Sequence, residues 1–159
     1  PPNLYGPNDN YSLTSGHVMA ALISKFYEAK IRNTKEVICW GSGNPLREFL
    51  YVDDLAKACL FIMENWDQNE NNSPIDGEGN TLNWLNVGSD EEISIKDLAN
   101  KISKIIGFQG EIIWDSSKPD GTPRKKLDTS IINKLGWHPS TNLEVGIQKT
   151  IAFYIKDYV

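Results

Sequence analysis

The chain has 159 residues, 40% of them hydrophobic and 23% charged, which describes an ordinary globular domain large enough to bury a core. Its formal net charge of −5 argues against a general nucleic-acid-binding protein, which needs a positive face to neutralise phosphates. No apolar run approaches the roughly 20 residues that span a membrane, and Cys39 and Cys59 are expected to be buried free thiols in a reducing, cytoplasmic compartment.

Signals for strands and helices alternate along the chain, with turn residues between them. The helical stretches carry apolar residues every three or four positions, whereas the strands are short runs rich in β-branched and aromatic residues. The expected elements are, in chain order, a strand end at 3–4, helix 17–30, strand 36–40, helix 53–66, strand 84–88, helix 94–106, strand 111–114, helix 130–135 and a final helix from about 142. This alternation predicts α/β layering with short strands and several helices.

Side chains that accept hydrogen bonds from free N–H groups are expected to begin the helices. The expected N-caps are Ser15, Asp53, Ser94 and Thr141. Ser94 is followed three residues later by Asp97, which is typical of a capping box, and Gly107 is expected to end that helix. Residues 67–81 are rich in Asn, Asp, Glu and Gly, and they predict a surface loop prone to disorder.

The stretch from Trp40 to Leu55 has the most specific pattern in the chain. It reads Trp-Gly-Ser-Gly-Asn-Pro-Leu-Arg-Glu-Phe-Leu-Tyr-Val-Asp-Asp-Leu, so a strand end is followed by a glycine loop and then by Arg47. The fork-shaped guanidinium of Arg47 suits a diphosphate, and the alternative is a structural ion pair with Glu48. Trp40 is either a core residue at a strand end or a wall of a ligand pocket.

This stretch resembles the carboxyl-terminal half of the extended short-chain dehydrogenases that act on nucleotide sugars. Two further stretches narrow the resemblance to the GDP-L-fucose synthase family: Asn-Leu-Tyr-Gly-Pro-Asn-Asp-Asn at 3–10, with Ser-Gly-His-Val at 15–18, and Lys-Pro-Asp-Gly-Thr-Pro-Arg-Lys at 118–125. That family converts GDP-4-keto-6-deoxy-D-mannose to GDP-L-fucose by 3,5-epimerisation and NADPH-dependent 4-reduction. The resemblance therefore implies a GDP-sugar substrate, NADPH as cofactor, and a homodimer for the full-length enzyme.

The resemblance also implies roles for individual residues. His17 matches the family's epimerase histidine, whose imidazole exchanges protons at sugar carbons that a neighbouring ketone acidifies. The implied cofactor-binding residues are Pro1, Pro2, Asn3, Leu4 and His17. The implied substrate-binding residues are Lys25, Trp40, Arg47 and Asp120. No His, Cys, Asp or Glu cluster has metal-ligand spacing, so no metal is expected.

Taken without the resemblance, several of these residues also have an ordinary structural interpretation. His17 is then an exposed or capping histidine, and Lys25 is a solvated lysine on a helix. The loop at 118–126 gathers several cations in an acidic protein, and it is either a solvated basic loop or an electrostatic lid over a charged substrate.

Two motifs of the resembled family do not occur in the chain. It has no glycine-rich dinucleotide fingerprint and no Tyr-x-x-x-Lys pair, and it begins at Pro1 without a methionine. Residues 1–159 are therefore expected to be the carboxyl-terminal substrate-binding domain of a longer enzyme, with the Rossmann core largely absent and no activity on their own. The alternatives are the same part of another nucleotide-sugar epimerase or dehydratase, or a non-catalytic GDP-sugar-binding module.

Overall fold

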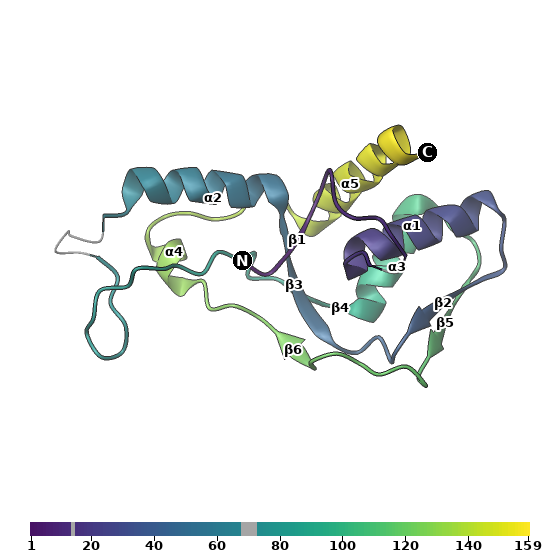
Figure 1. Ribbon diagram of the computed structural model, residues 1–159, viewed down its shortest axis with the longest axis horizontal. Helices are drawn as coiled ribbons and strands as arrows, with labels where there is room; N and C mark the ends of the chain where they lie inside the picture. Colours follow the sequence, from purple (N-terminus) through teal and green to yellow (C-terminus); the bar gives the residue numbers. More distant parts are fainter. Residues whose placement is uncertain (14, 68–72) are drawn as a thin grey trace.

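Figure 1 shows a computed structural model of the protein, which describes residues 1–13, 15–67 and 73–159. Its elements are, in chain order, β1 (Asn3–Tyr5), α1 (Val18–Ile31), β2 (Glu36–Trp40), β3 (Leu46–Tyr51), α2 (Val52–Asn65), β4 (Glu92–Ser94), α3 (Ile95–Ile106), β5 (Glu111–Asp115), β6 (Arg124–Lys125), α4 (Ser130–Lys134) and α5 (Leu143–Tyr158). The expected α/β arrangement of short strands and several helices is confirmed.

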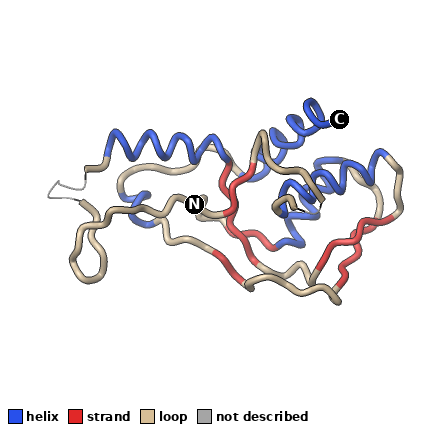
Figure 2. The backbone as a smooth tube through the Cα atoms, viewed as in Figure 1, coloured by secondary structure: helices blue, strands red, loops and turns tan. Residues whose placement is uncertain are grey.

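The main sheet is built around β3. β1 lies parallel to the second half of β3, with Asn3 opposite Phe49, and the two residues of β6 lie parallel to its first half. β4 is antiparallel to β3, with Leu46 opposite Ser94. Figure 2 shows these strands meeting in the middle of the molecule, although they come from distant parts of the chain. β2 and β5 form a separate parallel pair.

The larger hydrophobic core lies where α1, α3 and α5 pack together beside the strands. Among its members with almost no exposed surface are Met19, Ile23, Phe26, Leu98, Ile102 and Ile147. A smaller core lies between β3, α2 and α4, at the other end of the molecule in Figure 1. It contains Leu50, Ala58, Val87, Ile132 and Trp137. No helix in the described part of the chain is long and apolar enough to cross a membrane.

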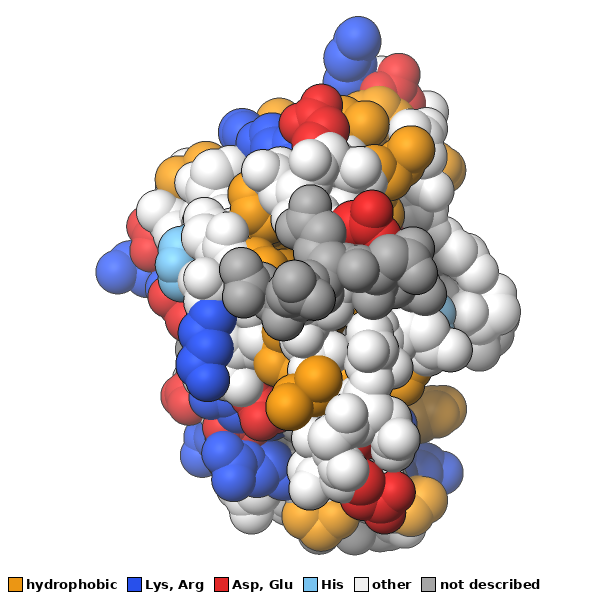
Figure 3. Space-filling model, turned by 90° about the vertical axis from the view of Figure 1, so that its left-hand side faces the viewer, with side chains coloured by type: hydrophobic (Ala, Val, Ile, Leu, Met, Phe, Trp, Pro, Cys, Tyr) orange, Lys and Arg blue, Asp and Glu red, His pale blue; other side chains and the backbone are white. Residues whose placement is uncertain are grey.

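The end of the molecule that carries α2 and α4 faces the viewer in Figure 3. Lysine and arginine side chains gather low on one side of this view, and acidic side chains lie beside them. On this face basic and acidic side chains are therefore mixed, in a chain whose formal net charge is −5.

One of the four predicted helix caps is confirmed. The Ser94 hydroxyl accepts the N–H of Asp97 at 3.0 Å, and Gly107 ends α3 in the left-handed conformation with φ of 78°. The other three predicted caps are wrong. Their places are taken by His17 before α1, Tyr51 before α2 and Asn142 before α5.

Contacts around the helix starts accompany two of these shifts. Asn142 accepts the N–H of Val145 at 2.9 Å, whereas the N–H of Thr141 is taken by the buried carboxylate of Asp54. Asp53 lies inside the first turn of α2, where its negative charge still favours the helix because of the helix dipole.

Two expectations about buried segments are also wrong. Cys39 is buried, but Cys59 is exposed, because the inner face of α2 runs through Asp54 and Ala58 and turns the next residue outward. Residues 84–88 are not a strand: Trp84 is 59% exposed, and the segment makes no strand ladder within the described residues.

The predicted disordered loop at 67–81 is described only in part. Residues 68–72 lie outside the described residues. Residues 75 and 81 form an isolated antiparallel bridge, and Asp76 holds the turn between them through its hydrogen bonds with Asn80. The expectation of disorder for 67–81 stays a prediction.

Candidate functional site

A cavity of about 410 Å³ opens where the parallel strands β1 and β3 end. We call it the His17 cavity. It is lined by residues 2–9, by His17 and by Val52, so it lies at the carboxyl ends of both strands. Open α/β sheets bind their ligands in this position, because the loops that follow parallel strands meet there. The fold therefore places the cavity where a ligand is expected.

The His17 cavity brings together four of the predicted cofactor-binding residues, namely Pro2, Asn3, Leu4 and His17. Pro1 is exposed and does not belong to the lining. Asn3 is held in place because its side-chain amide donates to the backbone carbonyl of Glu48 at 2.9 Å. Two segments that are apart in the sequence, β1 and the residue that precedes α1, thus line the same cavity.

His17 is exposed at the amino end of α1. Its backbone is extended, with φ of −66° and ψ of 158°, and its carbonyl accepts the first helical N–H, from Ala21, at 2.9 Å. Its side chain makes no capping hydrogen bond within the described residues. The capping interpretation therefore does not describe the imidazole, and its contact with a ligand stays a prediction.

The chain before His17 is fixed by a close approach that only glycine permits. A Cβ on Gly16 would lie 2.3 Å from the carbonyl oxygen of Asn10 and 2.5 Å from that of Ser12. Tyr11, earlier in the same loop, is buried and packs on Tyr154 of α5 with ring centroids 4.7 Å apart. The loop is thus anchored on α5, and its anchor sets the position of His17.

A second group of predicted residues surrounds the glycine loop that follows β2. Trp40 is 71% exposed, and the Lys118 ammonium lies 5.6 Å from its ring centroid. Asp120 accepts the backbone N–H of Ser42 at 2.8 Å and its hydroxyl at 2.7 Å. These hydrogen bonds lower the pKa of the Asp120 carboxyl. Asp120 thus ties the 118–126 loop to the glycine loop, and its contact with substrate stays a prediction.

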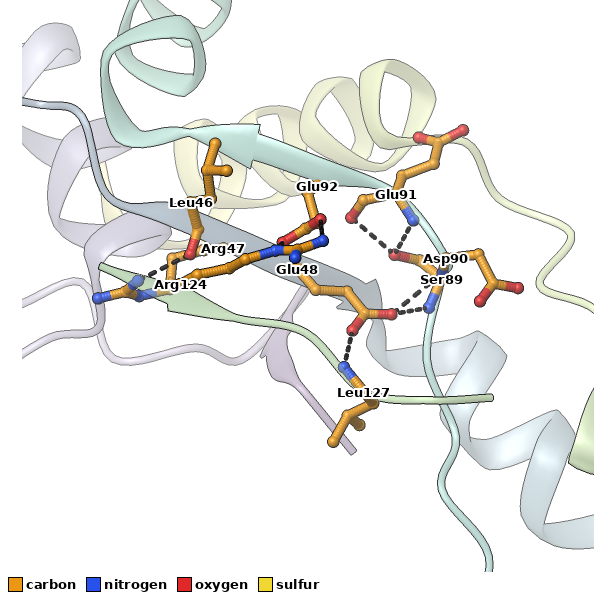
Figure 4. Close-up of polar contacts among 9 residues, drawn as sticks. All are labelled: Leu46, Arg47, Glu48, Ser89, Asp90, Glu91, Glu92, Arg124 and Leu127. Atoms are coloured by element: carbon orange, nitrogen blue, oxygen red, sulfur yellow. Dashed lines mark hydrogen bonds and ion pairs between the residues drawn. The ribbon is translucent and has the colours of Figure 1, made fainter. Parts of the chain in front are cut away.

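Arg47 and Glu48 are neighbours on β3, and their side chains point in different directions (Figure 4). The Arg47 guanidinium donates to the carbonyl of Leu46 at 2.7 Å, and its Nη2 lies 3.0 Å from where a Cβ on Gly121 would be. The structural alternative for Arg47 is wrong, since no ion pair joins it to Glu48 among the residues that the structure describes. Arg47 therefore lies between the strand and the 118–126 loop.

Glu48 is fully buried and holds three segments together. Its carboxylate accepts backbone N–H groups from Ser89 at 2.6 Å, from Asp90 at 3.0 Å and from Leu127 at 3.0 Å (Figure 4). A Cβ on Gly88 would lie 2.3 Å from one of its oxygens, so glycine is required there. We call these contacts the Glu48 clasp.

The cationic loop at 118–126 is attached to the sheet at several points. Arg124 forms a two-pronged pair with Glu92, at 2.8 and 2.6 Å, and so is not free to act as a lid. Lys125 lies opposite Arg47 in the pairing of β6 with β3. Of the loop's cations, Lys118 and Lys125 are thus placed near Trp40 and Arg47 respectively.

Lys25 joins α1 to β2. Its ammonium donates to the carbonyl of Ile38 at 2.8 Å, so it is not simply a solvated lysine. It lies about two turns along the helix from His17. Burial raises the pKa of the nearby Cys39 thiol, and the charge of Lys25 partly offsets that effect. Among the described residues no group of His, Cys, Asp or Glu side chains could hold a metal ion.

Residues 1–76 match the NAD dependent epimerase/dehydratase family. Over 159 residues the chain is 46% identical to "Probable GDP-L-fucose synthase 1" of Oryza sativa subsp. japonica, with 100% of this chain and 44% of that protein covered. It is 42% identical to "GDP-L-fucose synthase" of Escherichia coli (strain K12), with 99% and 48% covered. The chain is homologous to the GDP-L-fucose synthases. It spans about half the length of these curated relatives.

A solved structure of a GDP-L-fucose synthetase from Naegleria fowleri, bound to NADP, has the same fold. Its TM-score is 0.80 at 32% identity, over 98% of this chain and 45% of that one. The resemblance to extended short-chain dehydrogenases, and among them to the GDP-L-fucose synthases, is therefore confirmed, as is the fold class.

The His17 cavity fits one end of a dinucleotide better than the other. No lysine or arginine is found among the described residues that line it, and Asp9 adds a negative charge. A pyrophosphate would be repelled there, whereas an uncharged, flat ring and its ribose would be accepted. The lining thus fits the nicotinamide end of NADPH.

Sequence reasoning missed three functional or structural carboxylates: Asp9 in the cavity, Glu48 and Asp54. An acidic residue inside the apolar run that becomes β3 was the available signal for Glu48, since a charge in such a run is buried only when it is paired or hydrogen-bonded. No signal in the sequence distinguished Asp54 from its exposed neighbour Asp53.

Proposed function

We propose that residues 1–159 are the carboxyl-terminal, substrate-binding domain of a cytoplasmic, NADPH-dependent enzyme that converts GDP-4-keto-6-deoxy-D-mannose to GDP-L-fucose. The observation that carries the proposal is the meeting of Pro2, Asn3, Leu4 and His17 in one cavity at the carboxyl ends of β1 and β3, in a chain 42–46% identical to GDP-L-fucose synthases. The complete enzyme is proposed to be a homodimer.

His17 is proposed to exchange protons at carbons 3 and 5 of the sugar. Both carbons flank the ketone at carbon 4, so removing a proton from either gives an enolate. Inversion of each centre requires a base on one face of the ring and an acid on the other. An imidazole can act as a base or as an acid in catalysis. The exposed position of His17 allows the sugar to reach it.

The lining of the His17 cavity is proposed to hold the nicotinamide end of the cofactor beside the sugar. NADPH, when bound, supplies the hydride that reduces the ketone. Pro2, Asn3 and Leu4 orient the ring, and the hydrogen bond from Asn3 to the Glu48 carbonyl keeps this wall fixed to β3. A rigid wall favours one orientation of the ring and therefore one face of hydride transfer.

The residues around the glycine loop are proposed to hold the GDP-sugar. Arg47 suits the diphosphate because its planar guanidinium can pair with two phosphate oxygens. Trp40 presents a mostly exposed ring at the end of β2, which a flat or ring-shaped ligand would cover. Lys25 and Asp120 are proposed to contact the same substrate. The 159 residues contain no Tyr-x-x-x-Lys pair, so the chain alone is proposed to bind GDP-sugar without reducing it.

Deuterium exchange tests the role of His17. In the complete enzyme, His17→Gln should abolish exchange of solvent deuterium into carbons 3 and 5, because glutamine does not titrate. NADPH binding should be largely kept, because many lining residues contribute to it. His138→Gln, which changes the other exposed histidine, is the matched control and should exchange normally. Undiminished exchange at both carbons in His17→Gln would show that His17 has no part in the reaction.

A further inference from the structure

α2 is apolar on two sides, and the described residues cover only one of them. Leu55, Ala58 and Ile62 pack in the smaller core with β3 and α4. A second row of apolar side chains repeats at intervals of three or four residues, which places it along one side of the helix. We call it the outer stripe, and it consists of Val52, Ala56, Cys59, Leu60 and Met63.

Most of the outer stripe is open to solvent in this structure. Leu60 is 61% exposed, Met63 is 81% exposed, and Cys59 is exposed as well. Figure 1 shows α2 at the boundary of the molecule, with α4 to one side of it. Val52, at the start of the stripe, is half-buried and lines the His17 cavity. The stripe therefore runs along α2 from the proposed cofactor site outward.

The strand β1 is also without a neighbour on one side. It is the terminal strand of the main sheet, and its outer edge pairs with no strand among the described residues. An open edge strand presents a row of N–H and C=O groups, which natural sheets usually pair or protect. Parallel strands such as β1 and β3 occur mainly in sheets whose two faces are covered. The edge of β1 and the outer stripe thus both lack the neighbours that complete α/β sheets provide.

The relatives indicate what could cover these two features. A helix that is apolar on all sides is normally buried on all sides, and a row of exposed apolar side chains marks an interface. The chain covers 44% and 48% of two GDP-L-fucose synthases, so more than half of each relative lies outside the match. A second copy of the chain is less suitable, because a two-fold axis pairs identical edge strands antiparallel and would not continue the parallel arrangement of β1 and β3.

We propose that the outer stripe of α2 and the edge of β1 form one docking surface for the amino-terminal part of the complete enzyme. The docked part reaches the His17 cavity at Val52, so it completes the cofactor site as well as the sheet. This inference rests on the proposed function, in which residues 1–159 belong to a longer enzyme.

The reactivity of Cys59 tests the docking without any change to the stripe. In residues 1–159, N-ethylmaleimide should rapidly alkylate Cys59 and the thiol introduced by the control Asn100→Cys at an exposed position of α3, whereas Cys39 is buried and reports that the chain is folded. In the complete enzyme Cys59 should react at least about tenfold more slowly, because a covered thiol reacts only during local opening. The control thiol should keep its rate. Mass spectrometry of the digested protein assigns each rate.

A charge placed in the stripe gives a second test. In residues 1–159 Leu60→Glu leaves the new carboxylate in water, so the melting temperature should change by less than about 2 °C. In the complete enzyme the carboxylate would be buried against an apolar surface, and the melting temperature should fall by roughly 5–20 °C. Asn100→Glu adds the same charge to the exposed side of α3, and it should change both melting temperatures by less than about 2 °C.

The inference is overturned if Cys59 of the complete enzyme reacts as fast as the control thiol. If Leu60→Glu prevents the complete enzyme from folding, this labelling of the wild-type stripe decides. Sedimentation tests the occupant, since a change from dimer to monomer in Leu60→Glu at an unchanged melting temperature would mean that a second copy covers the stripe, and would also overturn the inference. A complete protein that protects Cys59 but makes no GDP-L-fucose would refute the proposed function and support the docking.

Discussion

Replacing Glu48 with glutamine should destabilise the protein severely. In the Glu48 clasp, both carboxylate oxygens act as acceptors for backbone N–H groups. A glutamine side chain has one acceptor oxygen and one NH₂ group. On one side of the clasp the NH₂ group would therefore point at a backbone N–H, and two donors cannot form a hydrogen bond. If the amide oxygen stays with Ser89 and Asp90, the N–H of Leu127 loses its partner. A lost hydrogen bond to a charged group, together with buried donors left unpaired, costs about 2–5 kcal/mol.

Thermal unfolding followed by circular dichroism measures this cost. For a chain of this size the expected free energy corresponds to a fall in melting temperature of roughly 4–20 °C. Glu111→Gln is the matched control, because Glu111 begins β5 and is exposed, and substitutions at such positions usually change stability by less than about 0.5 kcal/mol. If Glu48→Gln were as mild as Glu111→Gln, the clasp would not be a major source of stability, and the reasoning would be refuted.

Two further predictions concern other charged residues. Arg47→Ala in the complete enzyme should weaken GDP binding about 10- to 100-fold, and the melting temperature should stay nearly constant because the described hydrogen bond of Arg47 is to one backbone carbonyl. Calorimetric titration with GDP measures the affinity, with Arg32→Ala as an exposed control. An unchanged GDP affinity in Arg47→Ala would contradict the prediction. Burial alone raises the pKa of Asp54, but hydrogen bonds from Ser140, Thr141 and Lys57 outweigh it, so the folded pKa lies below the ordinary value. The stability that Asp54 contributes is therefore present above about pH 4 and is lost as the pH falls further. In urea unfolding at several pH values, Asp54→Asn should reduce the dependence of the unfolding free energy on pH in the acid range. The same dependence in the variant and the wild type would argue against this role of Asp54.

Features fixed by neighbouring residues were predictable from the sequence. The N-cap at Ser94 and the end of α3 at Gly107 are confirmed because both depend on contacts within one turn of helix. β2 and β5 were also predicted, since each is a short run rich in β-branched and aromatic residues bounded by turn residues.

Features that depend on distant segments were not predictable. β4 and β6 are short and polar, and they are strands because β3 offers them its edges. The apolar run from Trp84 lacks such an edge within the described residues and is therefore not a strand. The pattern along one segment indicates which side chains are stabilised by burial, but it does not indicate which other segment will cover them.

The candidate site divides in the same way. The motif containing His17 could be located from the sequence because its residues are contiguous, and the structure places His17 in a cavity with Pro2, Asn3 and Leu4. The pairing of Arg47 with Glu48 was the simple structural alternative, and it is wrong because Glu48 is engaged by amides from residues 41 to 79 positions later. Those partners lie beyond the reach of any local pattern.

The pairing of β3 has a consequence for the order in which the protein can fold. β3 is complete once residue 51 has been synthesised, but its pairing with β4 and β6 must wait for residues 92–94 and 124–125. Contacts between residues so far apart in the sequence form slowly, because a long loop must close before any of them is gained. Until then the edge of β3 and the carboxylate of Glu48 have no partners from that part of the chain. A nascent chain thus exposes this strand edge between the synthesis of β3 and that of β6, and unpaired strand edges favour aggregation.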